Sequence, residues 1–129
     1  GLRAIDGVET FSIFGEDHDR APVVSFVIDG LEPGLVSAAL SAEHAIAVRD
    51  GKFCAHPLVD ALLEDAGVEA RSAVRVSAGL ANTDEHIERL LAAVESLATR
   101  GPRAAYHVVE GEGWVPVEDP RDLSVTLPW

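Results

Sequence analysis

The chain has 129 residues, which is enough for one domain with a hydrophobic core and too few for two. With 47% hydrophobic and 25% charged residues, it has the composition of a folded globular protein rather than a disordered one. A formal net charge of −12 argues against nucleic acid and anionic membranes as partners, because both attract clusters of Lys and Arg.

A single cysteine excludes a disulfide within the chain, so nothing indicates an oxidising compartment. No apolar run approaches the length of a membrane-spanning helix, and no signal peptide opens the sequence. We therefore expect a cytoplasmic protein. The sequence has no Met and begins with Gly1, which indicates that a longer protein was processed or cloned at this point. Removal of an initiator Met is the alternative.

Hydrophobic periodicity and turn residues predict alternating strands and helices. The clearest element is a long helix whose apolar residues repeat from Ile87 to Ala98 and which Gly101 ends. Asn82 is its predicted N-cap, and Glu85 completes a capping-box pattern. The predicted elements, in order, are strands 10–14 and 23–28, helix 33–44, strand 45–48, helix 56–65, strand 73–77, a helix between 82 and 101, and a candidate strand 104–109.

This order predicts an α+β fold, with about three helices packed on one face of a mainly antiparallel sheet of about four strands. We expect residues 1–102 to form the domain. Residues 103–129 are interrupted by Gly and Pro, so we expect them to be an extension or tail of the same domain.

The segment 47–58 carries the side chains that are best suited to catalysis or anion binding. It holds the only cysteine (Cys54) and the only lysine (Lys52), with Arg49 and His56 in the same eight residues. A thiol near cations is expected to form the nucleophilic thiolate more readily, and Lys52 and His56 are the candidates for tuning it. The plainer interpretation is that Cys54 is a small, half-buried hydrophobic residue and Arg49 a surface charge. We read Asp17-His18-Asp19 as an acidic turn and predict no metal site.

Three segments occur in an order that resembles the C-terminal small domain of the class V aminotransferases, which are pyridoxal-phosphate enzymes of fold type I. The first is the cysteine segment, which is similar to the Ala-Val-Arg-x-Gly-x-x-Cys-Ala-x-Pro-Leu pattern of SufS-type cysteine desulfurases. The second is the strand that carries Arg75-Val76-Ser77, and the third is the helix start at 82–85. The resemblance covers about residues 10–100.

The resemblance implies roles for three residues. Cys54 matches the cysteine that attacks the substrate sulfur and carries a persulfide. Arg75 matches the arginine that pairs with the substrate α-carboxylate, and Arg49 matches a second active-site arginine. Lys52 and Phe53 stand where desulfurases commonly have two histidines. A class V aminotransferase, lyase or epimerase therefore stays open beside a desulfurase.

The resemblance also implies pyridoxal 5'-phosphate in the full-length enzyme, bound by an N-terminal large domain that supplies the Schiff-base lysine. That large domain is missing from this sequence, so we expect this chain alone to bind no cofactor, to be inactive, and to associate as a homodimer. A second class of function also stays open. The chain could be a ferredoxin-like α+β module that binds a ligand or partner without chemistry, with Cys54 inert.

Overall fold

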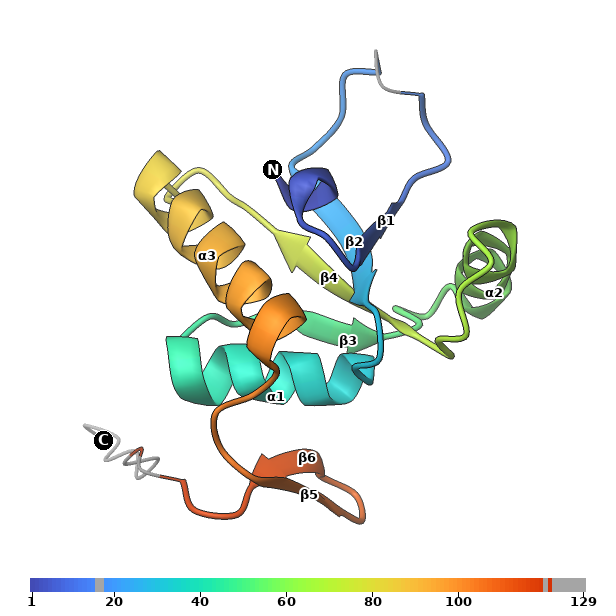
Figure 1. Ribbon diagram of the computed structural model, residues 1–129. Helices are drawn as coiled ribbons and strands as arrows, with labels where there is room; N and C mark the ends of the chain where they lie inside the picture. The colour runs from blue at the N-terminus through green and yellow to red at the C-terminus, as the bar shows by residue number, and fades with distance from the viewer. Residues whose placement is uncertain (16–17, 120, 122–129) are drawn as a thin grey trace, which may run out of the picture.

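The structure is a computed structural model, and it describes residues 1–15, 18–119 and 121. These residues form a four-stranded sheet with three α-helices, and a separate two-stranded sheet (Figure 1). None of the described helices is both long enough and apolar enough to cross a bilayer. The elements are η1 (Leu2–Ala4), β1 (Val8–Phe11), β2 (Val23–Ile28), α1 (Pro33–His44), β3 (Arg49–Gly51), α2 (His56–Asp65), β4 (Ala73–Ser77), α3 (Asp84–Arg100), β5 (Tyr106–Val109) and β6 (Gly113–Pro116).

The larger sheet has the strand order β1-β2-β4-β3, and every neighbouring pair is antiparallel. β3 is therefore an edge strand that pairs only with β4 in the described part of the chain. Helices α1 and α3 lie together against the sheet, whereas α2 lies apart from them (Figure 1). The predicted α+β class, the antiparallel sheet and the three helices are confirmed.

Successive residues of each strand point to opposite faces of the sheet, which creates two hydrophobic clusters. Phe26 and Val74 are buried in the main core with α1 and α3. Their neighbours Val27 and Ala73 belong to a smaller cluster with α2. The structure therefore shows something that the sequence did not predict. Helix α2 packs against the face of the sheet opposite to α1 and α3. The main core consists of Leu2, Phe26, Ile28, Val36, Ala39, Leu40, Val74, Leu90, Ala93, Val94 and Leu97.

β3 begins at Arg49 rather than in the predicted segment 45–48, because α1 ends in a left-handed residue. Ala45 has φ 53° and ψ 40°, and the N–H of Ile46 donates to the carbonyl of Leu40. This arrangement satisfies carbonyl groups at the helix end. The chain uses residues 45–48 to leave the helix and pairs with β4 only afterwards.

The N-cap of α3 is Thr83 rather than the predicted Asn82. The N–H of Thr83 donates to Nδ1 of His86 at 3.1 Å, so His86 occupies the position predicted for Glu85. The side-chain oxygen of Asn82 accepts a hydrogen bond from the N–H of Gly79 at 2.7 Å. Asn82 therefore stabilises the turn before the helix, which shifts the cap by one residue.

The predicted C-terminal extension contains a hairpin of β5 and β6 that packs against α1 (Figure 1). Its main attachment is the carboxylate of Glu43, whose side chain is 6% exposed. This carboxylate accepts hydrogen bonds from the backbone N–H groups of Arg103 and Ala104, from Arg103 Nε and from the Tyr106 hydroxyl, at 3.0 to 3.1 Å. One short segment thus satisfies a buried carboxylate. Residues 120 and 122–129 of the extension lie outside the described residues.

Titration of Tyr106, the only tyrosine, is expected to report this attachment. Burial, followed by the hydrogen bond and the negative charge of Glu43, raises the pKa of Tyr106 from 10.0 to about 12. The folded chain therefore keeps the phenol proton to higher pH than the unfolded chain. This contribution to stability is complete below pH 10.0 and is lost as the pH rises through about 12.

The near-ultraviolet absorbance of the phenolate should show a midpoint near 12 in the unsubstituted protein. In a Glu43→Ala variant the midpoint should move toward 10.0, the usual value for tyrosine. A midpoint that is the same in both proteins would mean that the contact between Tyr106 and Glu43 does not form in solution.

Candidate functional site

Arg49 and Arg75 are direct partners in the pairing of β3 with β4. Directly opposed residues of antiparallel strands have side chains on the same face, with Cβ atoms about 4.5–5.5 Å apart. The structure therefore brings together the two arginines that the sequence pointed to. Two like charges in this arrangement repel each other, and an anion bound to both relieves the repulsion. A carboxylate matches the fork of a guanidinium group especially well.

The arginine pair belongs to a row of residues that crosses the larger sheet. The pairing register places side by side Phe11 of β1, Ser25 of β2, Arg75 of β4 and Arg49 of β3. This row lies on the face that α2 contacts, which we call the arginine face. The next residue of β3, Asp50, pairs with the core residue Val74 and therefore lies on the opposite face.

Arg75 is partly buried, whereas Arg49 is exposed. The guanidinium carbon of Arg75 lies 4.9 Å from the centre of the Phe53 ring, which is a cation–π contact. The Nε atom of Arg75 is buried and has no hydrogen-bond partner in the described structure. Leaving a buried donor unpaired costs about 1–3 kcal/mol. A ligand that brought an acceptor to this atom would remove that cost.

A cavity of about 210 Å³ lies between α2 and the arginine face. Its polar groups come from Arg75 and Ser25, and the remaining wall is apolar. It is smaller than the roughly 300–1,000 Å³ of typical ligand pockets, which suits a small ligand. The apolar wall is formed by Phe11, Phe53, Ala55, Leu58, Val59, Leu62, Leu63 and Ala73.

The loop that carries Cys54 has a constrained backbone. Phe53 and Cys54 have φ angles of 54° and 60°, in the left-handed region that non-glycine residues seldom adopt. Such conformations cost on the order of 1 kcal/mol each, and they concentrate at functional sites. The Cys54 residue is exposed, and its neighbour Phe53 contacts Arg75. The loop therefore meets the arginine face one residue before the thiol.

Lys52 and His56, the two candidates for tuning the thiol, have different surroundings. Nζ of Lys52 lies 2.6 Å from Oδ1 of Asp60, and this ion pair ties the loop to α2. His56 is the exposed first residue of α2. Their effect on Cys54 stays a prediction, as do the roles expected for Cys54, Arg49 and Arg75.

Two residues of this region were not identified from the sequence. Ser25 is the only polar residue in the strand 23–28, and that exception is the signal that could have found it. Phe53 was noted only as a departure from a family pattern. Its stacking on Arg75 depends on how the loop folds back, which local sequence does not reveal.

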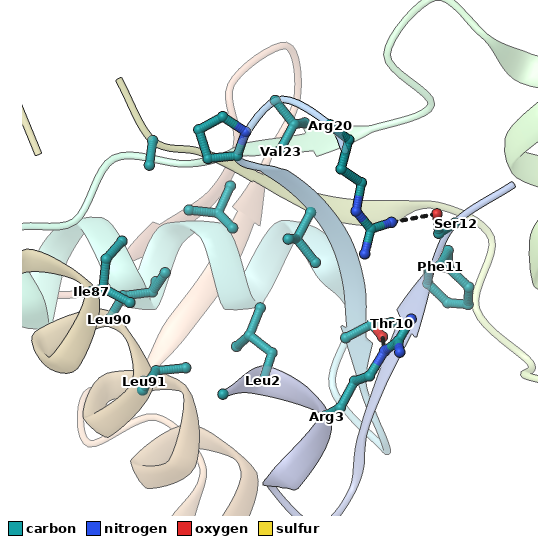
Figure 2. A pocket seen from close by; sticks show the side chains of 15 residues that line it. Leu2, Arg3, Thr10, Phe11, Ser12, Arg20, Val23, Ile87, Leu90 and Leu91 are labelled. Atoms are coloured by element: carbon teal, nitrogen blue, oxygen red, sulfur yellow. Dashed lines mark hydrogen bonds between the residues drawn. The ribbon is translucent and has the colours of Figure 1, made fainter. Parts of the chain in front are cut away.

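A second cavity, of about 380 Å³, lies between η1, α3 and the ends of β1 and β2 (Figure 2). Leu2, Leu90 and Leu91 form part of its apolar wall. Nη1 of Arg20 donates to Oγ of Ser12 at 2.6 Å on the other side. This cavity contains none of the residues that the sequence selected as functional.

The described residues contain no group of three or more His, Cys, Asp or Glu side chains that could hold a metal ion. The acidic turn noted in the sequence is covered only in part, because Asp17 lies outside the described residues.

The family model for aminotransferase class-V matches residues 1–90 of the chain. This range contains Arg49, the Cys54 loop and Arg75. It ends within α3, before the hairpin of β5 and β6.

Several curated proteins are similar to this chain. A probable cysteine desulfurase of Xylella fastidiosa is 40% identical over 93 residues, which are 72% of this chain and 20% of that protein. A probable cysteine desulfurase of Mycolicibacterium paratuberculosis is 43% identical over 100 residues, or 78% of this chain and 13% of that protein. The chain thus spans about a fifth or less of the length of these relatives. Among solved structures, the apo cysteine desulfurase from Thermococcus onnurineus NA1 is 37% identical with a TM-score of 0.49, covering 59% of this chain and 17% of that one.

Proposed function

The chain belongs to the aminotransferase class-V family, and we propose that it is the small C-terminal domain of a pyridoxal-phosphate enzyme that acts on an amino acid. In this proposal the chain forms one wall of the active site, and a large domain forms the rest. The observation that carries the proposal is the direct pairing of Arg49 with Arg75 beside the Cys54 loop. The much greater length of the relatives supports the need for a second domain.

The residues of this chain do not fit a complete pyridoxal-phosphate site. The cofactor is held through a Schiff base to a lysine, and the only lysine here is Lys52. Its ammonium group is paired with Asp60 at 2.6 Å, so it is engaged in holding the loop to α2. We therefore assign cofactor binding to the large domain.

The chain's own contribution, in this proposal, is to bind and orient the substrate. Arg75 receives the α-carboxylate, because its fork can donate two parallel hydrogen bonds. The Phe53 ring fixes the plane of that guanidinium group through the contact at 4.9 Å. Arg49 adds a second positive charge, and the apolar cavity beside Arg75 accommodates a small side chain.

We propose sulfur transfer as the reaction, which rests on the loop cysteine and on the cysteine desulfurases among the relatives. The Cys54 thiolate attacks the sulfur of a substrate cysteine, a sulfur–sulfur bond forms and the substrate carbon–sulfur bond breaks. In sum, cysteine and the Cys54 thiol give alanine and a Cys54 persulfide, so no external oxidant or reductant is required. The exposure of Cys54 allows the persulfide sulfur to pass to an acceptor.

The same proposal includes a homodimer in the cytoplasm, with residues 1–102 as the small domain and residues 103–129 as its extension. Exposed apolar side chains support contact with further protein, among them Ile13, Phe14 and Leu80, which are 64%, 50% and 110% exposed.

Arg75→Gln in the whole enzyme is expected to raise KM for the amino-acid substrate and lower kcat/KM about 100-fold. That factor corresponds to about 3 kcal/mol for the lost charge-assisted contact. The kcat/KM of Arg75→Lys should lie between those of the unsubstituted enzyme and Arg75→Gln, because lysine keeps the positive charge but lacks the forked guanidinium group. Arg71→Gln, an exposed arginine just before the same strand, is the matched control. If Arg75→Gln and Arg71→Gln have equal steady-state kinetics, Arg75 does not bind the substrate.

A further inference from the structure

β3 depends on support from outside its own sheet. It has three residues, lies at the edge, and pairs with β4 alone among the described strands. Three residues provide few ladder hydrogen bonds, so the position of such a strand is set largely by what packs against it. The element that packs against β3 is α1.

The C-terminal hairpin reaches the same turn of α1 that faces β3. A Cβ atom added at Gly34 of α1 would lie 3.0 Å from Cδ1 of Trp114 and 3.7 Å from Oδ2 of Asp50. Trp114 belongs to β6, and Asp50 is the central residue of β3. The indole and the carboxylate are therefore close neighbours at Gly34, and the absence of a side chain there allows both to approach the helix.

The hairpin and the residues that flank it, Arg103, Ala104 and Arg121, also hold both ends of α1. At the start of the helix, Nε1 of Trp114 donates to Oε2 of Glu32 at 3.1 Å. In the last turn, Nη1 of Arg121 donates to Oγ of Ser41 at 3.0 Å, and the Glu43 carboxylate accepts hydrogen bonds from Arg103, Ala104 and Tyr106. Only five residues separate Glu43 from Arg49. The connection into β3 thus starts from a fixed point.

We propose that the C-terminal segment formed by residues 103–119 and Arg121 braces β3 through α1, and that Trp114 is a positioning residue for Arg49. Trp114 touches neither substrate nor cofactor in this scheme. It holds the turn of α1 against which Asp50 lies, and Asp50 holds β3 with Arg49 on its opposite face. The functional consequence rests on the proposed function, whereas the structural brace does not.

Hydrogen exchange of backbone amides tests the brace directly. Trp114→Ala should speed exchange at residues 49–53 on the order of tenfold, while exchange in the β1–β2 pair stays unchanged. Trp114→Phe, which keeps most of the ring contact and loses the bond to Glu32, should have a smaller effect. Glu110→Ala is the control, because Glu110 is exposed on the same hairpin and is not a strand partner of Trp114. Unchanged exchange at 49–53 in Trp114→Ala would overturn the brace.

A second variant distinguishes a local effect on β3 from general destabilisation of the domain. Gly34→Ala places a methyl group 3.0 Å from the indole, so it should displace Trp114 while keeping every side chain of the hairpin. It should reproduce the faster exchange at 49–53 if the brace exists. Faster exchange over the whole chain in both variants would show that the hairpin merely stabilises the domain, and would overturn the local role.

Kinetics of the whole enzyme separate this inference from the proposed function. Trp114→Ala should raise KM several-fold with a smaller change in kcat, and it should add nothing further in an Arg49→Gln background. Additive effects in the double variant would show that Trp114 does not act through Arg49. If Arg49→Gln alone leaves the kinetics unchanged, the proposed function fails, and the exchange experiment still decides whether β3 is braced.

Discussion

Glu43→Ala is expected to lower the free energy of unfolding by about 3 kcal/mol, because it leaves several donors without their acceptor. The Glu43 side chain is only 6% exposed, so water cannot simply replace it. The half-buried hydroxyl of Tyr106 loses its partner, and the guanidinium of Arg103 loses its counter-ion. Glu43→Gln should cost less, since an amide oxygen still accepts. Chemical denaturation measures the difference.

The control for this prediction is Glu110→Ala. Glu110 lies in the same hairpin, is exposed, and should change stability by about 0.5 kcal/mol or less. Equal and small effects of the two substitutions would contradict the role assigned to the Glu43 carboxylate.

The same attachment should weaken in acid. Burial alone would raise the pKa of Glu43, but the hydrogen bonds from Ala104, Arg103 and Tyr106 outweigh it, and the pKa lies below the usual 4.5. Burial, followed by the charge of Arg103, lowers the pKa of His44 below 6.5. In both cases the unfolded chain binds more protons, so stability is lost as the pH falls. The loss begins below 6.5 through His44 and continues below 4.5 through Glu43.

Fluorescence of Trp114 in a Trp129→Phe background can follow the hairpin across this range. We expect the denaturation midpoint to fall in two stages as the pH decreases. In Glu43→Ala the stage below 4.5 should be smaller, and the remainder comes from Asp119, whose pKa is lowered to about 2 by hydrogen bonds from Arg121. A midpoint that stays constant from neutral pH to below 4.5 would contradict both assignments.

Cys54→Ala should abolish sulfur transfer in the whole enzyme, with a loss of about 1,000-fold or more in turnover of cysteine to alanine. The reason is that the thiolate is the group that accepts the sulfur, and no second cysteine exists in this chain to replace it. Mass spectrometry of the unsubstituted protein after reaction should find one extra sulfur atom on the peptide that contains Cys54.

Two variants make the Cys54 result specific. Cys54→Ser keeps the size of the side chain and should be equally inactive, because a hydroxyl does not accept sulfur. Ser77→Ala, a small polar residue at the end of β4, should retain activity. Full turnover of an amino acid by Cys54→Ala would falsify desulfuration and would favour amino-group transfer, a lyase or an epimerase.

The fold was largely predictable because most of its elements carry local signals. The strand 23–28 was predicted with its observed bounds, and the strand 73–77 likewise, since β-branched and other apolar residues predominate in both. β1 lies at 8–11 rather than 10–14. It pairs with residues 25–28 at the C-terminal end of β2, and the apolar residues that follow Phe11 take no part in this pairing. The position of α2 on the opposite face was not visible, because an amphipathic pattern shows which side of a helix is buried and not against which surface.

The sequence predicted which residues belong to the candidate site, but not how they are arranged in space. Arg49 and Arg75 stood out through a family resemblance, but their direct pairing depends on the register of β3, which starts four residues later than predicted. The hairpin attachment depends on contacts between residues 60 to 82 positions apart, such as Arg103 with Glu43 and Trp114 with Glu32. No local pattern encodes contacts over that separation.

The alternation along β3 makes the connection from Ala45 to Val48 sensitive to length. Deleting one residue there would slide the strand by one position, which exchanges the faces of Arg49 and Asp50. A carboxylate would then stand beside Arg75 and neutralise it, while the guanidinium of Arg49 would be directed toward the main core at Val76. Variants in which this connection is shorter or longer by an odd number of residues should therefore lose anion recognition. A change of two residues keeps Arg49 and Asp50 on their original faces of the sheet.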